Sequence, residues 1–431
     1  MWFKLQVLIH LLGMNAGRLL YERGIFDVQK FRLGKFRRIL QKSPYYRGLL
    51  RNNDPLSNLP LMSKEAFMEN FDAINTRGQK LSECMEIALR SEVSRDFSPM
   101  INGVSVGLST GTSGSRGLFL VSEKERARWV ALILDRVTGF SFRRRKVAFF
   151  LRANNNLYQS VKSGLLQFSY YDLFQPMEIS LAALARQQPH ILVAQPSVLC
   201  LIADAIQKKE LSIAPEKVIS VADVLSPEDR SFLERIFAQT IHQVYQCTEG
   251  FLAASCRYGT LHFNEDFLLI EKKFLDAEKT RFHPVITDLL RSTQPVVRYE
   301  LNDIVRLQES CPCGSRFSAI ASVEGRSDDI LRFTNSEGEI CSLFPDELRR
   351  CIVVADDQLK DYCLIQKEPD LLQLFVVGGL ANSFEKVSEA IRKLLLQYRI
   401  DQIRIEKPEN DPFLAGIKKR RVRNELSGKS T

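Results

Sequence analysis

The chain has 431 residues, of which 45% are hydrophobic and 26% are charged, so it is an ordinary globular protein long enough for roughly two or three domains. The sequence contains no internal repeat and no low-complexity segment. Its 60 Lys and Arg exceed its 51 Asp and Glu, but the excess occurs in short runs, Arg143–Lys146 and Lys418–Arg421. A solvated surface is the simpler interpretation of each run, with nucleic-acid binding as the alternative, so no nucleic-acid partner is expected.

Nine cysteines without regular spacing favour free thiols or metal ligands in a reducing compartment over a disulfide framework, so a cytoplasmic location is expected. The N-terminal stretch Met1–Leu12 is apolar but short, has only Lys4 before its core and shows no clear cleavage site. We therefore expect a packed helix rather than a signal peptide, with contact to a membrane surface as the alternative. No run reaches the roughly 18 uninterrupted apolar residues of a spanning helix, so no membrane span is expected.

From Val28 to Leu50 the pattern is helical and basic, and it closes at the stretch Ser43-Pro44-Tyr45-Tyr46-Arg47. A second short helix follows with Ser63 as its N-cap. These elements predict an N-terminal helical layer.

Residues 107–117 form a stretch of four glycines and five hydroxyl side chains, Gly-Leu-Ser-Thr-Gly-Thr-Ser-Gly-Ser-Arg-Gly. A backbone free of large side chains can direct its N–H groups at one point, which suits phosphate. Val104–Leu108 is a predicted buried strand, and Ser122–Glu125 is a capping box that opens a helix through Val137. The spacing matches neither the nucleoside-triphosphatase loop nor the dinucleotide fingerprint, and a surface loop is the alternative.

Apolar runs then alternate with helical ones. The predicted strands are 146–151, 167–173, 190–194, 217–222 and 241–245, and predicted helices cover 199–206 and begin at Ser226. This alternation favours a mostly parallel sheet with helices on both faces, in which ligands bind beyond the carboxyl ends of the strands. We expect the glycine loop to occupy such a position.

The pattern becomes strand-rich after Glu249, with short candidates at 267–271, 284–288 and 295–299. A compact unit follows Gly325, with predicted strands 363–366 and 372–377 and predicted helices 345–354 and 384–398. The predicted fold class is therefore α/β: a large N-terminal region, 1–327, with mixed and parallel sheets, and a small mobile α+β domain, 328–431.

Three further stretches carry polar groups near predicted strand ends: Tyr245–Gly250, Arg298–Asp303 and Glu324–Asp329. Each alone is more simply a solvated loop. In their order and spacing, however, together with the Tyr45 region, Lys64, the glycine loop and Val221-Ala222-Asp223, they resemble the adenylate-forming superfamily. The similarity is greatest to its phenylacetate–coenzyme A ligase-like branch, and Gly325-Arg326-Ser327-Asp328-Asp329 is the most specific match.

The resemblance implies an enzyme that joins a small carboxylic acid to the α-phosphorus of ATP, releases pyrophosphate, and passes the acyl group to a thiol. It implies that Asp303 holds the ribose hydroxyls and that Tyr245 lies along adenine, with Asp223 on the other side. Thr248 would contact the α-phosphate, and Glu249 would bind Mg²⁺. The remaining implied nucleotide contacts are Ser109, Thr110, Gly111, Thr112, Ser113 and Gly114 on the β- and γ-phosphates and Arg326 on a ribose or phosphate oxygen.

In this superfamily the C-terminal domain rotates between the two half-reactions, and the pivot position corresponds to Asp328. The lysine used in the first half-reaction corresponds to Lys418, with Lys419 one position away as the alternative. Two departures from the family pattern bear on ATP binding and on the acceptor: Gln246 stands where many relatives have glycine, and Ser115-Arg116 stands where many have lysine. Arg116 is the candidate replacement for that charge.

The cysteines carry one more motif. Cys311-Pro312-Cys313 places two thiols in a tight turn, and Cys256 with His262 forms a Cys-x5-His pair just before it. Short ligand spacings in two separate stretches are how structural zinc sites are built, and some members of this branch have a similar site. Unliganded thiols are the alternative.

The leading hypothesis is an ATP-dependent acid–thiol ligase that uses coenzyme A or a carrier protein as acceptor. The alternatives are an adenylyltransferase, an amide-forming or carrier-protein ligase with the same first step, and a non-catalytic zinc-stabilised binding protein. Asn154–Tyr158 and Phe168–Tyr171 are candidate residues of the pocket that holds the acid.

Overall fold

The computed structural model describes the chain except residues 1, 51–53, 95, 97–98, 109–116, 140–142, 152–165, 174, 327–328, 357, 411, 413–419 and 427–431. The chain divides into two compact units. Unit 1 comprises residues 1–111, 115–301 and 306–322, and unit 2 comprises 112–114, 302–305 and 323–431. The functional boundary at 327/328 stays a prediction, because both flanking residues lie outside the described part.

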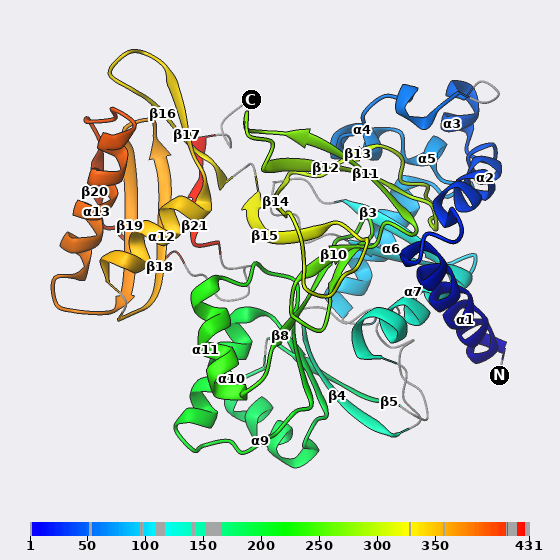
Figure 1. Ribbon diagram of the computed structural model, residues 1–431, viewed down its shortest axis with the longest axis horizontal. Coiled ribbons are helices and arrows are strands. Elements are labelled where there is room, and N and C mark those ends of the chain that lie inside the picture. The colour runs from blue at the N-terminus through cyan, green and yellow to red at the C-terminus, as the bar shows by residue number, and fades with distance from the viewer. Residues whose placement is uncertain are drawn as a thin grey trace. The chain divides into compact units, whose positions relative to one another are not determined.

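Most strands of unit 1 belong to a twelve-stranded mixed sheet (Figure 1). Its first half consists of five parallel strands in the order β5 (Leu166–Asp172), β4 (Arg145–Leu151), β6 (Ile191–Ala194), β7 (Lys217–Ser220) and β8 (Ile241–Gln246). All five predicted strands are therefore present and parallel. The order continues from β8 through β9 (Phe251–Ser255), β10 (Leu261–Phe263), β15 (Ala319–Arg326), β14 (Asp303–Gln308), β12 (Arg281–Asp288) and β11 (Leu268–Phe274).

Strict alternation along β4 assigns its side chains to two cores. Ala148 and Phe150 pack with α9 (Met177–Gln187), α10 (Pro196–Gln207) and α11 (Pro227–Phe237), whereas Val147 and Phe149 pack with α7 (Glu123–Ile133) and the N-terminal helices. Helices thus cover both faces of the parallel half, as predicted. Helix α11 begins where expected, because Ser226 accepts a hydrogen bond from the Asp229 backbone N–H at 3.0 Å.

The N-terminal layer is helical. It contains α1 (Trp2–Glu22), α2 (Val28–Leu40), α3 (Pro44–Leu49), the 3₁₀ turn η1 (Leu56–Asn58), α4 (Lys64–Glu69), α5 (Phe71–Ile74) and α6 (Leu81–Ser94). The predicted helical stretch 28–50 is two helices, because Ser43 caps α3 and Pro44 occupies its first turn. Ser63 caps α4 as predicted.

The surroundings of the glycine loop differ from the expected strand–loop–helix order. A separate antiparallel sheet contains β1 (Met100–Ile101), β2 (Val104–Leu108) and β3 (Leu118–Ser122), and the loop joins β2 to β3. Residues 118–122 form a strand that the sequence did not predict, with Leu118 and Leu120 buried. Helix α7 begins only after this strand. The capping box is present: Glu125 accepts from the Ser122 backbone N–H at 2.9 Å. Beyond α7 the helix continues as a π-helical turn, Leu134–Thr138.

The predicted strand 295–299 is wrong for most of its length, since only β13 (Tyr299–Glu300) forms, on the edge of β12. Arg298 has φ +47°, a conformation that interrupts a strand. Its N–H is satisfied instead by the Thr287 hydroxyl at 3.0 Å.

Unit 2 is a small α+β structure. A four-stranded sheet has the order β20 (Arg404–Glu406), β19 (Leu371–Gly378), β18 (Leu359–Glu368) and β21 (Val422–Asn424), and a hairpin pairs β16 (Leu331–Thr334) with β17 (Ile340–Leu343). Helices α12 (Pro345–Ala355) and α13 (Ser383–Gln397) share one core with these strands. The predicted α/β fold class is confirmed. No helix in the described part of the chain combines the length and apolar character that crossing a bilayer requires.

Candidate functional site

The turn after β8 is the centre of the candidate nucleotide site in unit 1. Strand β8 is parallel to β7 and antiparallel to β9, so it joins the two halves of the sheet. The pairing shifts register between Tyr245 and Gln246, which is the geometry of a β-bulge. Bulges redirect side chains and often occur beside active sites. The Cys247 N–H then donates to the Gly250 carbonyl at 3.0 Å and closes the turn that carries Thr248 and Glu249.

Residues from distant parts of unit 1 hold this turn. Arg291 donates to the Thr248 carbonyl at 3.2 Å, and the Trp129 indole N–H donates to the Gln246 amide oxygen at 3.2 Å. Burial raises the pKa of Tyr299, and the negative charge of the nearby Glu249 carboxylate raises it further. Tyr299 therefore stays a neutral hydroxyl that donates to Glu249. A residue with a β-carbon in place of Gly250 would meet the Asp288 carboxylate at 3.3 Å, so the turn packs closely on β12.

Arg291 also belongs to a buried cluster of charged groups behind the turn. Burial raises the pKa of Glu125, but the charge of Arg291 and hydrogen bonds from Ser122 and Thr293 outweigh burial and lower it overall. Asp288, which is fully buried, has its pKa raised to about 6 by burial. The turn is thus supported by one ionised carboxylate and one that titrates near neutral pH.

Asp288 gives a testable dependence of stability on pH. Its unfolded pKa is about 3.9, so between about pH 4 and pH 6 only the unfolded chain loses this proton, and stability is lost as pH rises through 6. An Asp288→Asn variant should therefore gain about 2–3 kcal/mol relative to the wild type across this range, and nothing further above it. Urea unfolding at pH 4, 5, 6 and 7 measures this difference. The exposed Asp204→Asn on α10 is the control, and an equally flat difference for both variants would contradict the assignment.

Asp223 follows a strained turn at the end of β7. Ala222 has φ +69°, and the Asp223 N–H donates to the Val221 carbonyl at 2.9 Å, which defines a γ-turn. Residues in such conformations concentrate at functional sites. The structure therefore places Asp223 beyond the carboxyl end of a parallel strand, as predicted.

In unit 2, the structure brings Asp303 and Arg326 together. Asp303 begins β14, Arg326 ends β15, and the guanidinium Nε lies 3.8 Å from the Asp303 carboxylate. Asp329, in the same motif, is anchored too, because Arg420 Nε donates to its carboxylate at 2.8 Å. Arg421 donates to Asp361 at 3.0 Å. The two arginines of the C-terminal basic run are thus bound to carboxylates within the protein.

Several predicted site residues lie outside the described part of the chain. These are Ser109, Thr110, Gly111, Thr112, Ser113, Gly114, Asp328, Lys418 and the alternative Lys419, together with Arg116 and the candidate pocket stretch Asn154–Tyr158. Their roles stay predictions. In the other pocket stretch, Tyr171 stacks on Phe150 with ring centroids 4.5 Å apart, so this tyrosine belongs to the core.

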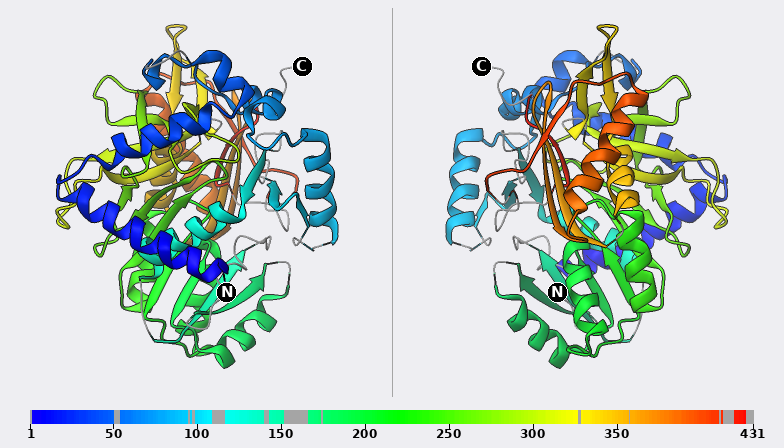
Figure 2. Two further views of the ribbon diagram at one scale, coloured as in Figure 1. Left: turned by 90° about the vertical axis from the view of Figure 1, so that its right-hand side faces the viewer. Right: turned by 90° about the vertical axis from the view of Figure 1, so that its left-hand side faces the viewer.

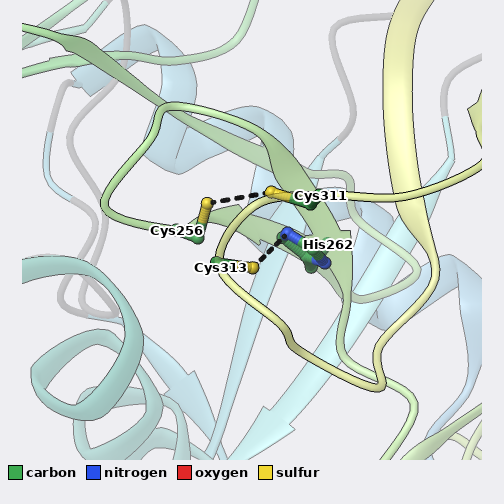
Figure 3. Close-up of side chains that lie close together, drawn as sticks. All are labelled: Cys256, His262, Cys311 and Cys313. Carbon is green, nitrogen blue, oxygen red and sulfur yellow. Dashed lines mark hydrogen bonds between the residues drawn. The ribbon is translucent and has the colours of Figure 1, made fainter.

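Cys256, His262, Cys311 and Cys313 form a cluster in unit 1 (Figure 3). Their four ligand atoms all lie within 4.8 Å of one another. Cys256 follows β9, His262 lies on β10, and the other two occupy the loop between β14 and β15. The antiparallel pairing of β10 with both β9 and β15 brings the two stretches together.

The distances fit a tetrahedral zinc ion. With zinc–sulfur bonds of about 2.3 Å, two sulfurs of a tetrahedron lie about 3.8 Å apart. Cys256 Sγ and Cys311 Sγ are separated by 3.7 Å, and Cys313 Sγ lies 3.3 Å from His262 Nε2. His262 Nδ1 lies 2.9 Å from the Phe317 carbonyl oxygen, which can only accept a hydrogen bond. Nδ1 therefore carries the proton, and Nε2 keeps its lone pair for a metal.

The surroundings of the cluster act differently on its thiols. Backbone N–H groups of Tyr258 and Ser315 point at Cys256 Sγ and Cys313 Sγ, at 3.4 and 3.5 Å. Burial opposes ionisation of Cys311, but hydrogen bonds from the Cys313 backbone and from Thr260 outweigh burial and lower its pKa to about 6. Burial raises the pKa of Cys313 to about 11. A metal would thus meet a thiolate at Cys311 and would displace the proton of Cys313 on binding.

A cavity of about 310 Å³ adjoins the cluster. Its lining includes Arg18 and Arg136, but Asp135 accepts hydrogen bonds from both arginines. Arg136 also donates to Asp266 at 2.9 Å. Because both charges are paired within the protein, neither of these two arginines is free to bind an anionic ligand.

Arg291, Trp129, Tyr299 and Asp288 were not assigned roles from the sequence. They reach the β8 turn from α7, from β12 and from the segment after it, so no local spacing links them to Tyr245–Gly250. Only Tyr299 carried a signal, since it lies in the stretch Arg298–Asp303.

The chain was compared with protein families, known proteins and solved structures. No protein-family model matches the chain. Protein CapK of Staphylococcus aureus is 21% identical over 402 residues, which span 86% of this chain and 81% of CapK. The structure of 2-hydroxyisobutyryl-CoA ligase in the postadenylation state, in complex with 2-HIB-AMP, has a TM-score of 0.63 and 16% identity over 93% of this chain and 90% of the ligase.

The amide bond synthetase McbA from Marinactinospora thermotolerans has a TM-score of 0.54 and 13% identity over 76% of this chain and 69% of McbA. The protein therefore has the fold of the adenylate-forming ligases. The sequence resemblance predicted this fold. The phenylacetate–coenzyme A ligase-like branch stays a prediction.

Proposed function

We propose that the protein activates a small carboxylic acid with ATP and transfers the acyl group to a thiol, with coenzyme A as the preferred acceptor. The observation that carries the proposal is the turn Tyr245–Gly250. It begins with a bulge at the carboxyl end of a parallel strand, in a fold shared over nine-tenths of both chains with an acid–coenzyme A ligase. Ligands of open α/β sheets bind at such strand ends.

ATP supplies the phosphoanhydride bond, and the chain's own residues would position the reacting groups. Tyr245 and Asp223 would hold the adenine, and Thr248 would contact the α-phosphate. Glu249, which accepts a hydrogen bond from Tyr299, would offer its remaining oxygen lone pairs to Mg²⁺, a cation that prefers carboxylates and substrate phosphates. Asp303 would accept both ribose hydroxyls, and its neighbour Arg326 would donate to a ribose or phosphate oxygen.

Two acceptors of the acyl group can be distinguished by experiment. A likeness to the amide bond synthetase McbA makes an amine the second candidate. Pyrophosphate release screened over short aliphatic and aromatic acids tests the first half-reaction, and AMP release with coenzyme A or an amine distinguishes the acceptors. If none of the screened acids causes pyrophosphate release, the first half-reaction is contradicted, and a non-catalytic binding protein is favoured.

Glu249→Gln should lower Mg²⁺-dependent pyrophosphate release by about tenfold or more while changing nucleotide affinity far less. The amide still accepts the hydrogen bond from Tyr299 but lacks the charge that the metal needs. Initial rates against Mg²⁺ concentration and nucleotide titration measure the two effects. Glu210→Gln, an exposed change, is the control. Unchanged turnover in Glu249→Gln would remove this carboxylate from the site.

A further inference from the structure

Helix α1 presents an apolar face to solvent as well as to the core. Its exposed large hydrophobic residues lie at spacings of three and four, which is one face of a helix. They are Trp2, Leu5, Leu8, Ile9, Leu12, Leu19 and Leu20. Among the exposed positions of α1, only Lys4 is charged, and the rest are apolar or small.

The opposite face of α1 is fixed to unit 1. Leu11, Met14 and Gly17 are buried there, and α1 packs along α7 (Figure 2). Asn15 donates to the Asp135 carboxylate at 2.7 Å. Arg32 of α2 crosses at Gly17, where a β-carbon would meet its guanidinium at 2.8 Å. Because the buried face is tied by these contacts, α1 cannot turn its outer apolar residues inward.

Exposed aromatic residues and cations continue this surface onto α2. Phe26 and Phe31 are about half exposed and stack edge to face, with centroids 5.8 Å apart. Lys35 lies 4.2 Å from the Phe31 ring. Residues 2–42 contain nine Lys and Arg against two Asp and Glu, so this short segment carries +7 of the chain's net +9. The exposed cations are Lys4, Arg23, Lys30, Lys35, Arg38 and Lys42.

We propose that the α1–α2 surface, defined by the exposed residues of segment 2–42, docks the protein on an anionic lipid bilayer. An amphipathic helix with a Trp and aliphatic face and a basic border lies in the interface plane, with its apolar side among the acyl chains. Each basic residue near such a surface strengthens binding about fivefold. Helix α1 is roughly 30 Å long, so its apolar face can lie along the membrane over its whole length.

The charge distribution favours a membrane over a second copy of the chain. In a symmetric dimer through this surface, two strongly basic segments would face each other, and like charges across an interface oppose association. In the described part of segment 2–42 the only exposed carboxylate is Asp27, which already caps α2 through the Lys30 N–H at 2.9 Å. Anionic headgroups supply the missing negative charge.

Cosedimentation with vesicles tests the proposal. The full chain should bind vesicles of phosphatidylcholine with 30% phosphatidylglycerol at least tenfold more tightly than vesicles of phosphatidylcholine alone, and less tightly as salt is raised. Ile9→Glu should weaken binding at least tenfold, and Lys30→Glu with Lys35→Glu should do the same. Ile179→Glu on α9 is the matched control, because Ile9 and Ile179 are both 57% exposed.

Thermal unfolding of each variant verifies that it folds. Trp2 emission should shift to the blue on vesicle addition, and Trp2→Phe should remove that change. The proposal is overturned if the folded wild type binds neither vesicle, or if Ile9→Glu binds as the wild type does. It is also overturned if Ile9→Glu converts a dimer that binds no vesicles into a monomer, which would assign the surface to a second copy.

Discussion

Replacing Lys418 by alanine should lower adenylate formation by about a hundredfold or more and leave thiolysis of a supplied acyl adenylate unchanged. A lysine at this position would neutralise the negative charge that develops as the carboxylate attacks the α-phosphorus, and such electrostatic groups contribute on that scale. In the superfamily that the sequence resembles, the C-terminal domain changes orientation between the two half-reactions, so the same lysine would be absent from the second step. Measuring pyrophosphate release and thioester formation separately distinguishes the two steps.

The described residues that follow Lys418 and Lys419 are fixed within unit 2. Arg420 is bonded to Asp329, Arg421 is bonded to Asp361, and β21 pairs with β18 from Val422 onward. Lys419→Ala is the matched comparison one residue away. A selective loss in Lys419→Ala instead would move the role by one position, and equal loss of both half-reactions in Lys418→Ala would contradict the role itself.

The parallel half of the sheet could be predicted because each strand carries a complete local signal. In β4 the alternation of Val147 and Phe149 with Ala148 and Phe150 reflects burial on both faces by helices. The caps Ser63 and Ser226 likewise fixed helix starts through bonds within three residues. Local sequence suffices where the partner group is local.

Local sequence patterns could not predict contacts between residues that lie far apart in the sequence. The antiparallel pairing of β2 with β3 depends on which strand Leu118–Ser122 joins, and the period of two does not specify that. Arg298 interrupts the expected strand 295–299 through a left-handed backbone and a bond to Thr287, eleven residues away. The supports of the β8 turn, Trp129 and Arg291, act through single long-range hydrogen bonds.

The cluster of Cys256, His262, Cys311 and Cys313 combines local signals with long-range contacts. The spacings Cys-x-Cys and Cys-x5-His can be seen in the sequence. The two pairs come together in space only because β10 pairs with both β9 and β15. The carbonyl of Phe317, which holds the His262 tautomer, has no sequence signal at all, because any residue supplies a carbonyl. Backbone groups that complete a site are therefore found only from structure.

One zinc ion per chain is expected on Cys256, His262, Cys311 and Cys313, with a structural role. Four protein ligands complete a tetrahedral shell, whereas a catalytic zinc keeps one position for water or substrate. The ion would tie the β9–β10 turn to the loop between β14 and β15. Elemental analysis of the purified protein measures the stoichiometry, and absence of zinc there would end the assignment.

Cys313→Ser should lower the zinc content and the melting temperature together, the latter by roughly 5–15 °C, because the free energy of metal binding is also free energy of folding. A chelator should lower the melting temperature of the wild type towards that of the variant and leave the variant unaffected. Cys200→Ser is the control, since Cys200 lies outside the cluster and a serine hydroxyl can still donate to Asp229 as the thiol does at 3.8 Å. If Cys313→Ser and Cys200→Ser melt alike and retain equal zinc, the cluster is a set of free thiols and the loop is held by the pairing of β10 with β15 alone.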